Sequence, residues 1–275
     1  MATSQRESGG EATTVGRLIQ QWRRVRKKSQ LTLALQAGVS ARHVGFLEIG
    51  RANPSREMIL LLAGALDVPL RERNALLLAA GYAPLYRETG LDAPEMEHAR
   101  KAVGLILQHQ EPYPAVVMDR HWNILRTNHA AERFFSELIT LPGAGAPANI
   151  IRLMFDPAGL RPYVANWESV AETLIQRVHR EALGGVPDAE TAELLEEVLA
   201  SPGVPRQWRS PDWLAPFPKP YVAIQFRKGS LARDFFSTVT TLGTPLDVTL
   251  QEIRIECFFP ADDQTTSSVE TLASS

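Results

Sequence analysis

Between residues 14 and 88, apolar side chains recur every three or four positions, which is the spacing of amphipathic helices. The first predicted helix carries Leu18, Ile19, Trp22 and Val25 on one face. Two short helices joined at Gly38 follow, then a fourth helix after Ser55. A fifth begins at about Leu70 and stops at Gly81. The pattern predicts a small all-α domain of five helices.

The two short helices predict a helix-turn-helix. Gly38 can adopt the positive φ that ends the first of them, and Ser40 offers a side-chain oxygen to the free N–H groups of the second. Val44 and Leu47 give the second helix only a narrow apolar edge. Its other face carries Ala41, Arg42, His43 and Phe46. A helix of this kind suits the major groove of DNA.

Residues 14–88 resemble the lambda-repressor-like, or Xre-type, DNA-binding domains in the order and lengths of these helices. The resemblance implies that Gln30, at the start of the second helix, contacts phosphate or base; the alternative is a solvated helix start. It also implies a structural ion pair between Arg23 and Glu48, which would hold the first and third helices together.

Candidate DNA contacts follow from the side chains on the exposed face. Arg42 can donate two hydrogen bonds to guanine, and Phe46 either meets a thymine methyl group or packs inward. Arg51 precedes a loop and is expected to touch phosphate. Ser40 and His43 are expected to position the helix rather than to read sequence.

Charge is unevenly distributed along the chain. Its overall net charge is −2, but residues 1–90 carry +6 and the remainder −8. A basic first part can approach a polyanion, whereas an acidic second part is repelled by it. Only the first domain is therefore expected to touch DNA.

The second half of the chain has both helical and strand-like patterns. After a helix over residues 94–110, residues 115–128 form two β-rich runs around a short polar turn, which predicts a hairpin. Further helices are predicted at 130–140, 167–183 and 188–200, and further strands at 221–227, 235–242 and 250–259. This order predicts a small antiparallel sheet with helices over one face, so the whole chain is α+β.

Residues 95–260 resemble the PAS-like, MmyB-like ligand-binding domains that follow Xre-type domains in bacterial regulators. The motifs that carry the resemblance are Pro112-Tyr113-Pro114-Ala115, Asp119-Arg120-His121-Trp122-Asn123, Phe155-Asp156-Pro157, Asn166-Trp167, Phe236-Ser237-Thr238 and Gly243-Thr244-Pro245-Leu246-Asp247-Val248-Thr249-Leu250. The resemblance implies a hydrophobic pocket that accepts a fatty acid.

Several residues are candidates for such a pocket. The apolar ones, which either line a cavity or fill the core, are Phe134, Ile151, Met154 and Phe155. A fatty-acid carboxylate needs a cation or hydroxyl partner, because burying an unpaired charge is costly. Arg152, Arg161 and Tyr163 are candidates for that role, or else they are surface or structural residues.

The cysteine count, the lengths of the apolar runs and the polar segments give further information on the class of protein. A single cysteine, Cys257, excludes an internal disulfide, fits a reducing cytoplasm, and is expected to be buried filler on a strand. No apolar run is long enough to span a membrane. Residues 1–13 and 261–275 are expected to be a disordered start and tail, and 89–94 a connector.

Together these patterns predict a transcription regulator that binds double-stranded DNA as a homodimer and senses a small apolar ligand. A metabolic enzyme is the main rival class, but the sequence holds no recognisable catalytic motif. A second domain that only dimerises or binds a protein partner is an alternative. A haem-bearing sensor is another, although the six scattered histidines show no metal-site spacing, and no cofactor is expected.

Overall fold

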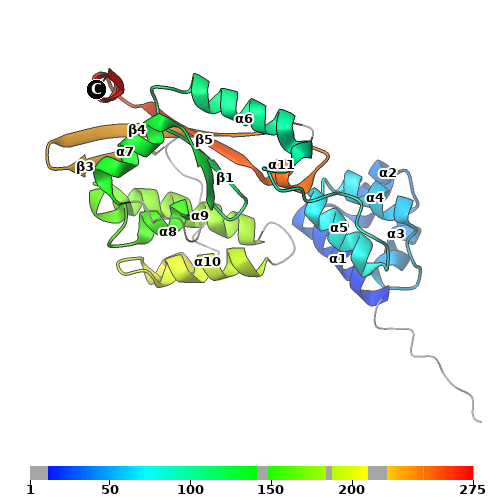
Figure 1. Cartoon of the computed structure of the whole chain (residues 1–275). Helices are drawn as coiled ribbons and strands as arrows, with labels where there is room; N and C mark the ends of the chain where they lie inside the picture. Colours follow the sequence, from blue (N-terminus) through cyan, green and yellow to red (C-terminus); the bar gives the residue numbers. More distant parts are fainter. Residues whose placement is uncertain (1–11, 141–147, 184–187, 210–221, 244, 275) are drawn as a thin grey trace, which may run out of the picture. The chain divides into compact units, whose positions relative to one another are not determined.

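The computed structural model describes residues 12–140, 148–183, 188–209, 222–243 and 245–274 (Figure 1). Its chain forms two compact units. The first holds the residues up to Glu88 together with Pro245–Gln251, and the second takes in Thr89–Ala182, Asp188–Thr244 and Glu252–Ser275. None of the helices in the described part is both long and apolar enough to cross a bilayer.

The first unit contains the five predicted helices. Their bounds are α1 Ala12–Val25, α2 Gln30–Ala37, α3 Ala41–Glu48, α4 Arg56–Ala65 and α5 Leu70–Ala79. Their apolar faces meet in one core cluster, which includes Ile19, Trp22, Leu33, Val44, Leu47, Ile59, Leu62 and Leu76. Short helices of this length are stabilised mainly by that packing.

Three serines cap helices in this unit. The side-chain oxygens of Ser29, Ser40 and Ser55 accept hydrogen bonds from backbone N–H groups in the first turns of α2, α3 and α4, at 3.0, 3.1 and 3.2 Å. Gly38 ends α2 with φ of +65°, a conformation that favours glycine. The predicted turn between α2 and α3 is confirmed.

The second unit is built on a five-stranded sheet. The strands are β1 Ala115–Met118, β2 Ile124–Thr127, β3 Ile224–Lys228, β4 Leu231–Thr241 and β5 Arg254–Pro260. They lie in the order β2-β1-β5-β4-β3, and every neighbouring pair is antiparallel. The α+β fold class is therefore confirmed.

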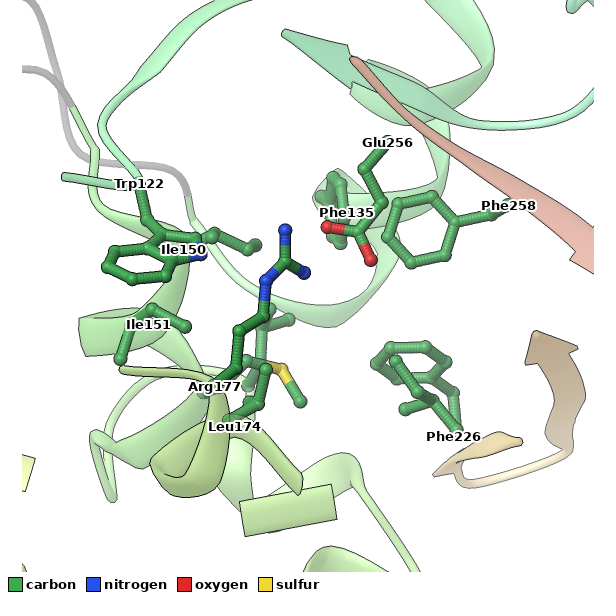
Figure 2. Close-up of a pocket in the computed structure, with 12 residues that line it drawn as sticks. Trp122, Phe135, Ile150, Ile151, Leu174, Arg177, Phe226, Glu256 and Phe258 are labelled. Atoms are coloured by element: carbon green, nitrogen blue, oxygen red, sulfur yellow. The ribbon is translucent and has the colours of Figure 1, made fainter. Parts of the chain in front are cut away.

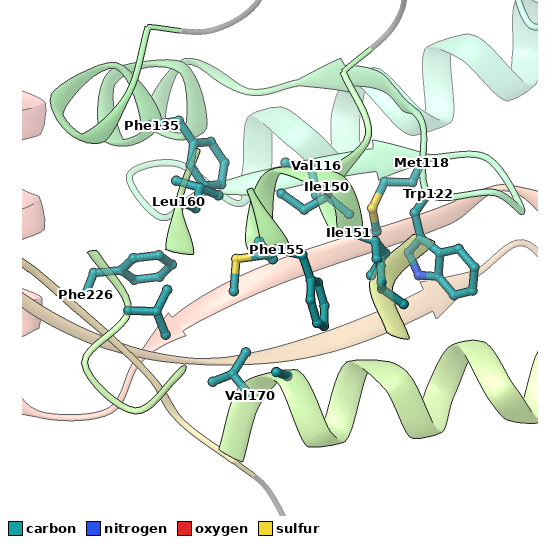
Figure 3. Close-up of a cluster of buried hydrophobic side chains, with 14 of the residues drawn as sticks. Val116, Met118, Trp122, Phe135, Ile150, Ile151, Phe155, Leu160, Val170 and Phe226 are labelled. Carbon is teal, nitrogen blue, oxygen red and sulfur yellow. The ribbon is translucent and has the colours of Figure 1, made fainter. Parts of the chain in front are cut away.

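The main helices of this unit are α6 Glu97–His109, α7 His129–Leu138, α8 Ile150–Phe155, α9 Trp167–Leu183, α10 Ala189–Ala200 and α12 Asp263–Ser274. Side chains from α7 to α10 pack on one face of the sheet, where Val116, Met118 and Phe226 are buried (Figure 3). Val117, on the other face of β1, is also buried, and Figure 1 shows α6 lying along that side of the sheet.

Two expectations for this half were wrong. The last strand begins at Arg254 rather than at residue 250, because Val248–Glu252 form the short helix α11. Residues 263–274 form α12 rather than a disordered tail. Asp262 accepts the N–H of Thr265 at 2.7 Å, and Thr265 and Val269 are buried, so packing orders a segment whose composition suggested disorder.

Candidate functional sites: a helix-turn-helix surface and an apolar cavity

The exposed face of α3 carries the predicted DNA-reading residues. The Arg42 guanidinium carbon lies 5.2 Å from the centroid of the Phe46 ring, and Arg42 is exposed while Phe46 is half-buried. Ala41 and His43 are half-buried on the same helix, whereas Val44 and Leu47 face the core. The face thus presents a cation held against an aromatic ring.

A buried carboxylate lies behind this face. Glu48, at the end of α3, accepts hydrogen bonds from Arg23 at 2.6 and 2.8 Å, from Gln30 at 2.9 Å and from Gln20 at 3.3 Å. Burial by itself would raise the pKa of Glu48, but these donors outweigh it and hold the pKa below its ordinary value. The hydrogen bond to Glu48 raises the pKa of Arg23.

Gln30 makes a hydrogen bond within the protein, which neither a DNA contact nor a solvated helix start had anticipated. Its amide nitrogen donates to Glu48, and Gly45 lies close to its amide oxygen: a Cβ at Gly45 would be 3.5 Å away. Arg51 is exposed after α3, and its backbone N–H donates to the carbonyl of Phe46 at 2.8 Å. The exposed Arg51 side chain is therefore free to contact a molecule that lies against α3.

The second unit contains a cavity between the sheet and its helices (Figure 2). Its helical side is lined by Phe135, Ile150, Ile151, Met154 and Leu174, and its sheet side by Ile224, Phe226, Glu256 and Phe258. The volume of the cavity is about 30 Å³, which is room for about two water molecules. A larger molecule fits only if the lining residues move apart.

One end of the cavity is polar. Figure 2 shows the Arg177 guanidinium reaching from α9 to lie between the Trp122 indole and the Glu256 carboxylate. Ser237 donates a hydrogen bond to Glu256 at 2.5 Å. The indole nitrogen of Trp122 is buried and has no hydrogen-bond partner among the described residues. The cavity therefore combines an apolar body with a charged end.

The four apolar residues predicted to bind the ligand divide into two groups. Ile151 and Met154 line the cavity. Phe134 and Phe155 are buried in the adjoining core, where the rings of Phe134 and Phe226 lie 5.0 Å apart and those of Phe155 and Trp167 lie 5.6 Å apart.

The three polar candidates lie outside the cavity lining. Arg152 is half exposed and pairs with Glu197 at 2.9 Å. Arg161 stacks on the Trp167 ring at 3.9 Å, and Lys228 lies 4.9 Å from the centroid of the Tyr163 ring. Each of the three thus has a contact within the protein, although Nη1 of Arg161 is buried without a hydrogen-bond partner among the described residues.

The polar cavity residues Trp122, Arg177 and Glu256 were not predicted as binding residues. Trp122 belongs to the turn motif that carried the family resemblance, but nothing local shows where its ring points. In β5, Arg254, Glu256 and Phe258 are two residues apart and therefore share one face of the strand. A charged residue among apolar ones on such a face is the sequence signal that could have indicated a polar group at the cavity.

A second hollow, of about 670 Å³, lies along α6, β2 and the start of α7. Its lining includes Arg100, Glu111 and Arg126. Arg100 donates to two backbone carbonyls at 2.9 and 3.0 Å, Glu111 pairs with Arg133, and Arg126 pairs with Asp92. Because the lining of this hollow is mainly polar and charged, the apolar cavity is the stronger candidate for binding an apolar ligand.

Comparison with known proteins identifies both units. Residues 99–272 match the family model of the MmyB-like transcription regulator ligand binding domain, and residues 19–73 match the Helix-turn-helix model. These are transcription regulators and not enzymes. Within the described residues, no group of acidic, histidine or cysteine side chains is arranged to hold a metal ion.

One solved structure that resembles the chain is the restriction-modification controller protein C.AhdI from Aeromonas hydrophila. It is 34% identical, covers 25% of this chain and 99% of its own, and has a TM-score of 0.23. No curated protein matches the chain.

Proposed function

The chain belongs to the MmyB-like transcription regulators, with a DNA-binding helix-turn-helix and a ligand-binding domain, and from this premise we propose that its ligand is a fatty acid. The observation that carries the proposal is a cavity with an apolar body and a polar part in which Arg177 offers a cation beside Glu256. The fatty acid chain would lie between the sheet and the helices, with its carboxylate at the charged end.

The energetics favour an elongated apolar molecule. Burying a hydrocarbon chain contributes about 0.8 kcal/mol per CH₂, so a chain of moderate length offsets the entropy lost on binding. A buried carboxylate also needs a partner of opposite charge, and Arg177 lines the cavity. Phe226 and Phe258 on the sheet side supply aromatic surface for the chain.

The small volume of the cavity suggests how binding would be coupled to a change of state. A fatty acid does not fit in about 30 Å³, so the ligand must bind a form in which the lining residues have moved apart. A ligand that binds one form better than another shifts the population toward it. We propose that this shift changes the affinity of the protein for DNA.

For the DNA-binding unit we propose that α3 enters the major groove. Arg42 and Phe46 would read base edges, and Arg51 and Gln30 would contact the backbone. Ser40, Ala41 and His43 would set the position of the helix. One such helix reads only a few base pairs, so a homodimer on an inverted repeat would supply operator-level specificity.

Extraction of the purified full chain with organic solvent, followed by mass spectrometry, tests the ligand class. We expect a long-chain fatty acid among the extracted molecules, and we expect added fatty acid to change operator affinity in a titration. Fatty acid binding with unchanged DNA affinity would contradict the proposed coupling between ligand binding and DNA binding. A protein that neither carries nor binds fatty acids would contradict the ligand, and would favour a second domain that only dimerises or binds a protein partner.

A further inference from the structure

We propose that Trp122 and Arg177, assisted by Arg254, form the site that binds the carboxylate head of the ligand. This inference rests on the proposed function, because it assigns the polar end of the same cavity. It replaces the three candidates expected from sequence, Arg152, Arg161 and Tyr163, which lie outside the cavity lining.

Trp122 carries a buried hydrogen-bond donor that is not used within the described residues. This residue is 1% exposed and lines the cavity, and its indole N–H has no acceptor among the described residues. A buried donor without a partner is costly, and native proteins seldom leave one unsatisfied. A carboxylate oxygen in the cavity would supply the missing acceptor.

Two arginines lie next to the Trp122 ring and differ in how closely they are paired. The guanidinium carbons of Arg254 and Arg177 lie 4.8 and 6.0 Å from the centroid of the Trp122 ring. Glu181 pairs closely with Arg254, at 2.7 Å, but its distance to Arg177 is 3.8 Å. Arg177 is therefore the more weakly paired cation, and it is the one that lines the cavity.

Arg254 contributes a second unused donor. Its Nη1 is buried and has no hydrogen-bond partner in the described part of the chain. The turn that carries Trp122 and the helix that carries Arg177 thus bring N–H donors to the cavity, and Arg254, which is not one of the lining residues, lies against the Trp122 ring. Several N–H donors close together favour a ligand group that only accepts hydrogen bonds, and a carboxylate can accept several of them at once.

Glu256 sets the position of the head group. Its carboxylate also lines the cavity, and it would repel a second carboxylate placed beside it. Figure 2 shows the Arg177 guanidinium between Glu256 and Trp122. A ligand carboxylate on the Trp122 side of Arg177 is shielded from Glu256 by that cation, and Ile150 and Ile151 supply apolar surface on that side.

The backbone of Trp122 supports a specific role for this side chain. Trp122 has φ of +63°, in the left-handed region that bulky residues rarely adopt. Asp119 holds the turn by accepting the N–H groups of His121 and Asn123 at 2.8 and 2.9 Å. Residues kept in such conformations cluster at functional sites, and here the turn directs an indole into the cavity.

The test compares dodecanoic acid with its methyl ester on the full chain and three variants. Trp122→Phe keeps a ring and removes the N–H, and Arg177→Gln removes the charge. Arg152→Gln is the matched control, because Arg152 pairs with Glu197 outside the cavity lining. We expect the first two variants to bind dodecanoate about tenfold more weakly, by loss of one buried polar contact. The control should bind it as the unmodified chain does.

A spectroscopic readout does not depend on the stability of the variants. The chain has five tryptophans, and their indole N–H signals are separately visible in a ¹⁵N-labelled protein. Dodecanoate should move the Trp122 signal downfield. Trp22 is the internal control, since its indole nitrogen is also buried without a partner among the described residues but lies in the core of the first unit.

The outcomes separate this inference from the proposed function. If dodecanoate binds the unmodified chain, yet Trp122→Phe and Arg177→Gln bind it equally well and the Trp122 signal is unmoved, the head-group site is wrong and the fatty acid ligand stands. Equal affinity for the acid and its ester would also contradict the site. If neither probe binds the unmodified chain, the proposed ligand is wrong and the site falls with it.

Discussion

Arg23 on α1 and Glu48 on α3 form a two-pronged ion pair, with Nε to Oε1 at 2.6 Å and Nη2 to Oε2 at 2.8 Å. The Glu48 side chain is fully buried and that of Arg23 is 12% exposed. Planar two-bond geometry of this kind is specific to arginine. The pair joins the first helix to the helix that we propose reads DNA, so the stability of the fold and the position of the reading helix depend on the same contact.

Replacing Arg23 by alanine should destabilise the first unit by about 3 kcal/mol, because it leaves a buried carboxylate without its main partner. Hydrogen exchange of the α1 and α3 amides, measured by mass spectrometry on the full chain, reports this unit separately. Arg24→Ala is the matched control, since Arg24 is the exposed neighbour on the same helix. Equal exchange in the two variants would show that the ion pair contributes little.

The same network predicts a loss of stability in acid. The pKa of Glu48 is lower in the folded protein than its ordinary value of 4.5. Its contribution is therefore complete at pH values above 4.5 and declines as the pH falls toward the folded pKa. Exchange of the α3 amides should accelerate over that range. In Glu48→Gln the unit should be less stable at neutral pH and show a weaker acid dependence; an unchanged dependence would assign it to other carboxylates.

Substitutions at Arg42 and Arg51 should affect DNA binding differently. Arg42→Ala should relax the preference at one position of each half-site by about 1–3 kcal/mol, because a base contact is lost. Arg51→Ala should weaken binding to all sequences alike. The slope of the logarithm of the binding constant against the logarithm of the salt concentration should become shallower by about one. Binding to a randomised operator library at several salt concentrations measures both effects. A uniform loss in both variants would remove Arg42 from base reading.

The helix-turn-helix was predictable because its signals are local. Ser40 accepts the N–H of His43, three residues along the chain, and Gly38 adopts the positive φ that ends α2, so residues close in sequence carry the information. The helices α8 and α11 were missed because they have six and five residues, too few for a periodic apolar pattern. The residues of α11 also run directly into the alternating pattern of β5.

The cavity was predictable in kind but not in detail. An antiparallel sheet under helices implies apolar residues between them, and Ile151 and Met154 do line the cavity. The polar end depends on strand pairing instead. Because β1 pairs with β5, the turn after β1 comes close to the start of β5, and with it Trp122 to Arg254. No local pattern encodes that register, so sequence reasoning chose arginines near the predicted helices.

Asn149 should be important for the stability of the second unit. Its side-chain oxygen caps α8 by accepting the N–H of Arg152 at 3.1 Å, and its amide nitrogen donates to the carbonyl of His121 at 2.7 Å and to Asn123 at 3.0 Å. Asn149→Ala should cost about 2 kcal/mol, from the cap and the buried donors together. Asn149→Ser keeps a capping oxygen and should cost about half as much; urea unfolding compares them. Equal stability of alanine and serine variants would show that the cap is unimportant.

The operator should consist of two half-sites related by inversion. If a homodimer binds, two copies of α3 must reach two major-groove segments on the same face of the duplex. Their centres should then lie about 34 Å apart, one helical turn, or a multiple of that distance. Footprinting with the full chain should reveal two protected half-sites related by inversion, and sedimentation of the complex should give two chains per operator. A single half-site bound by one chain would contradict the dimer, and would require one reading helix to supply all of the specificity.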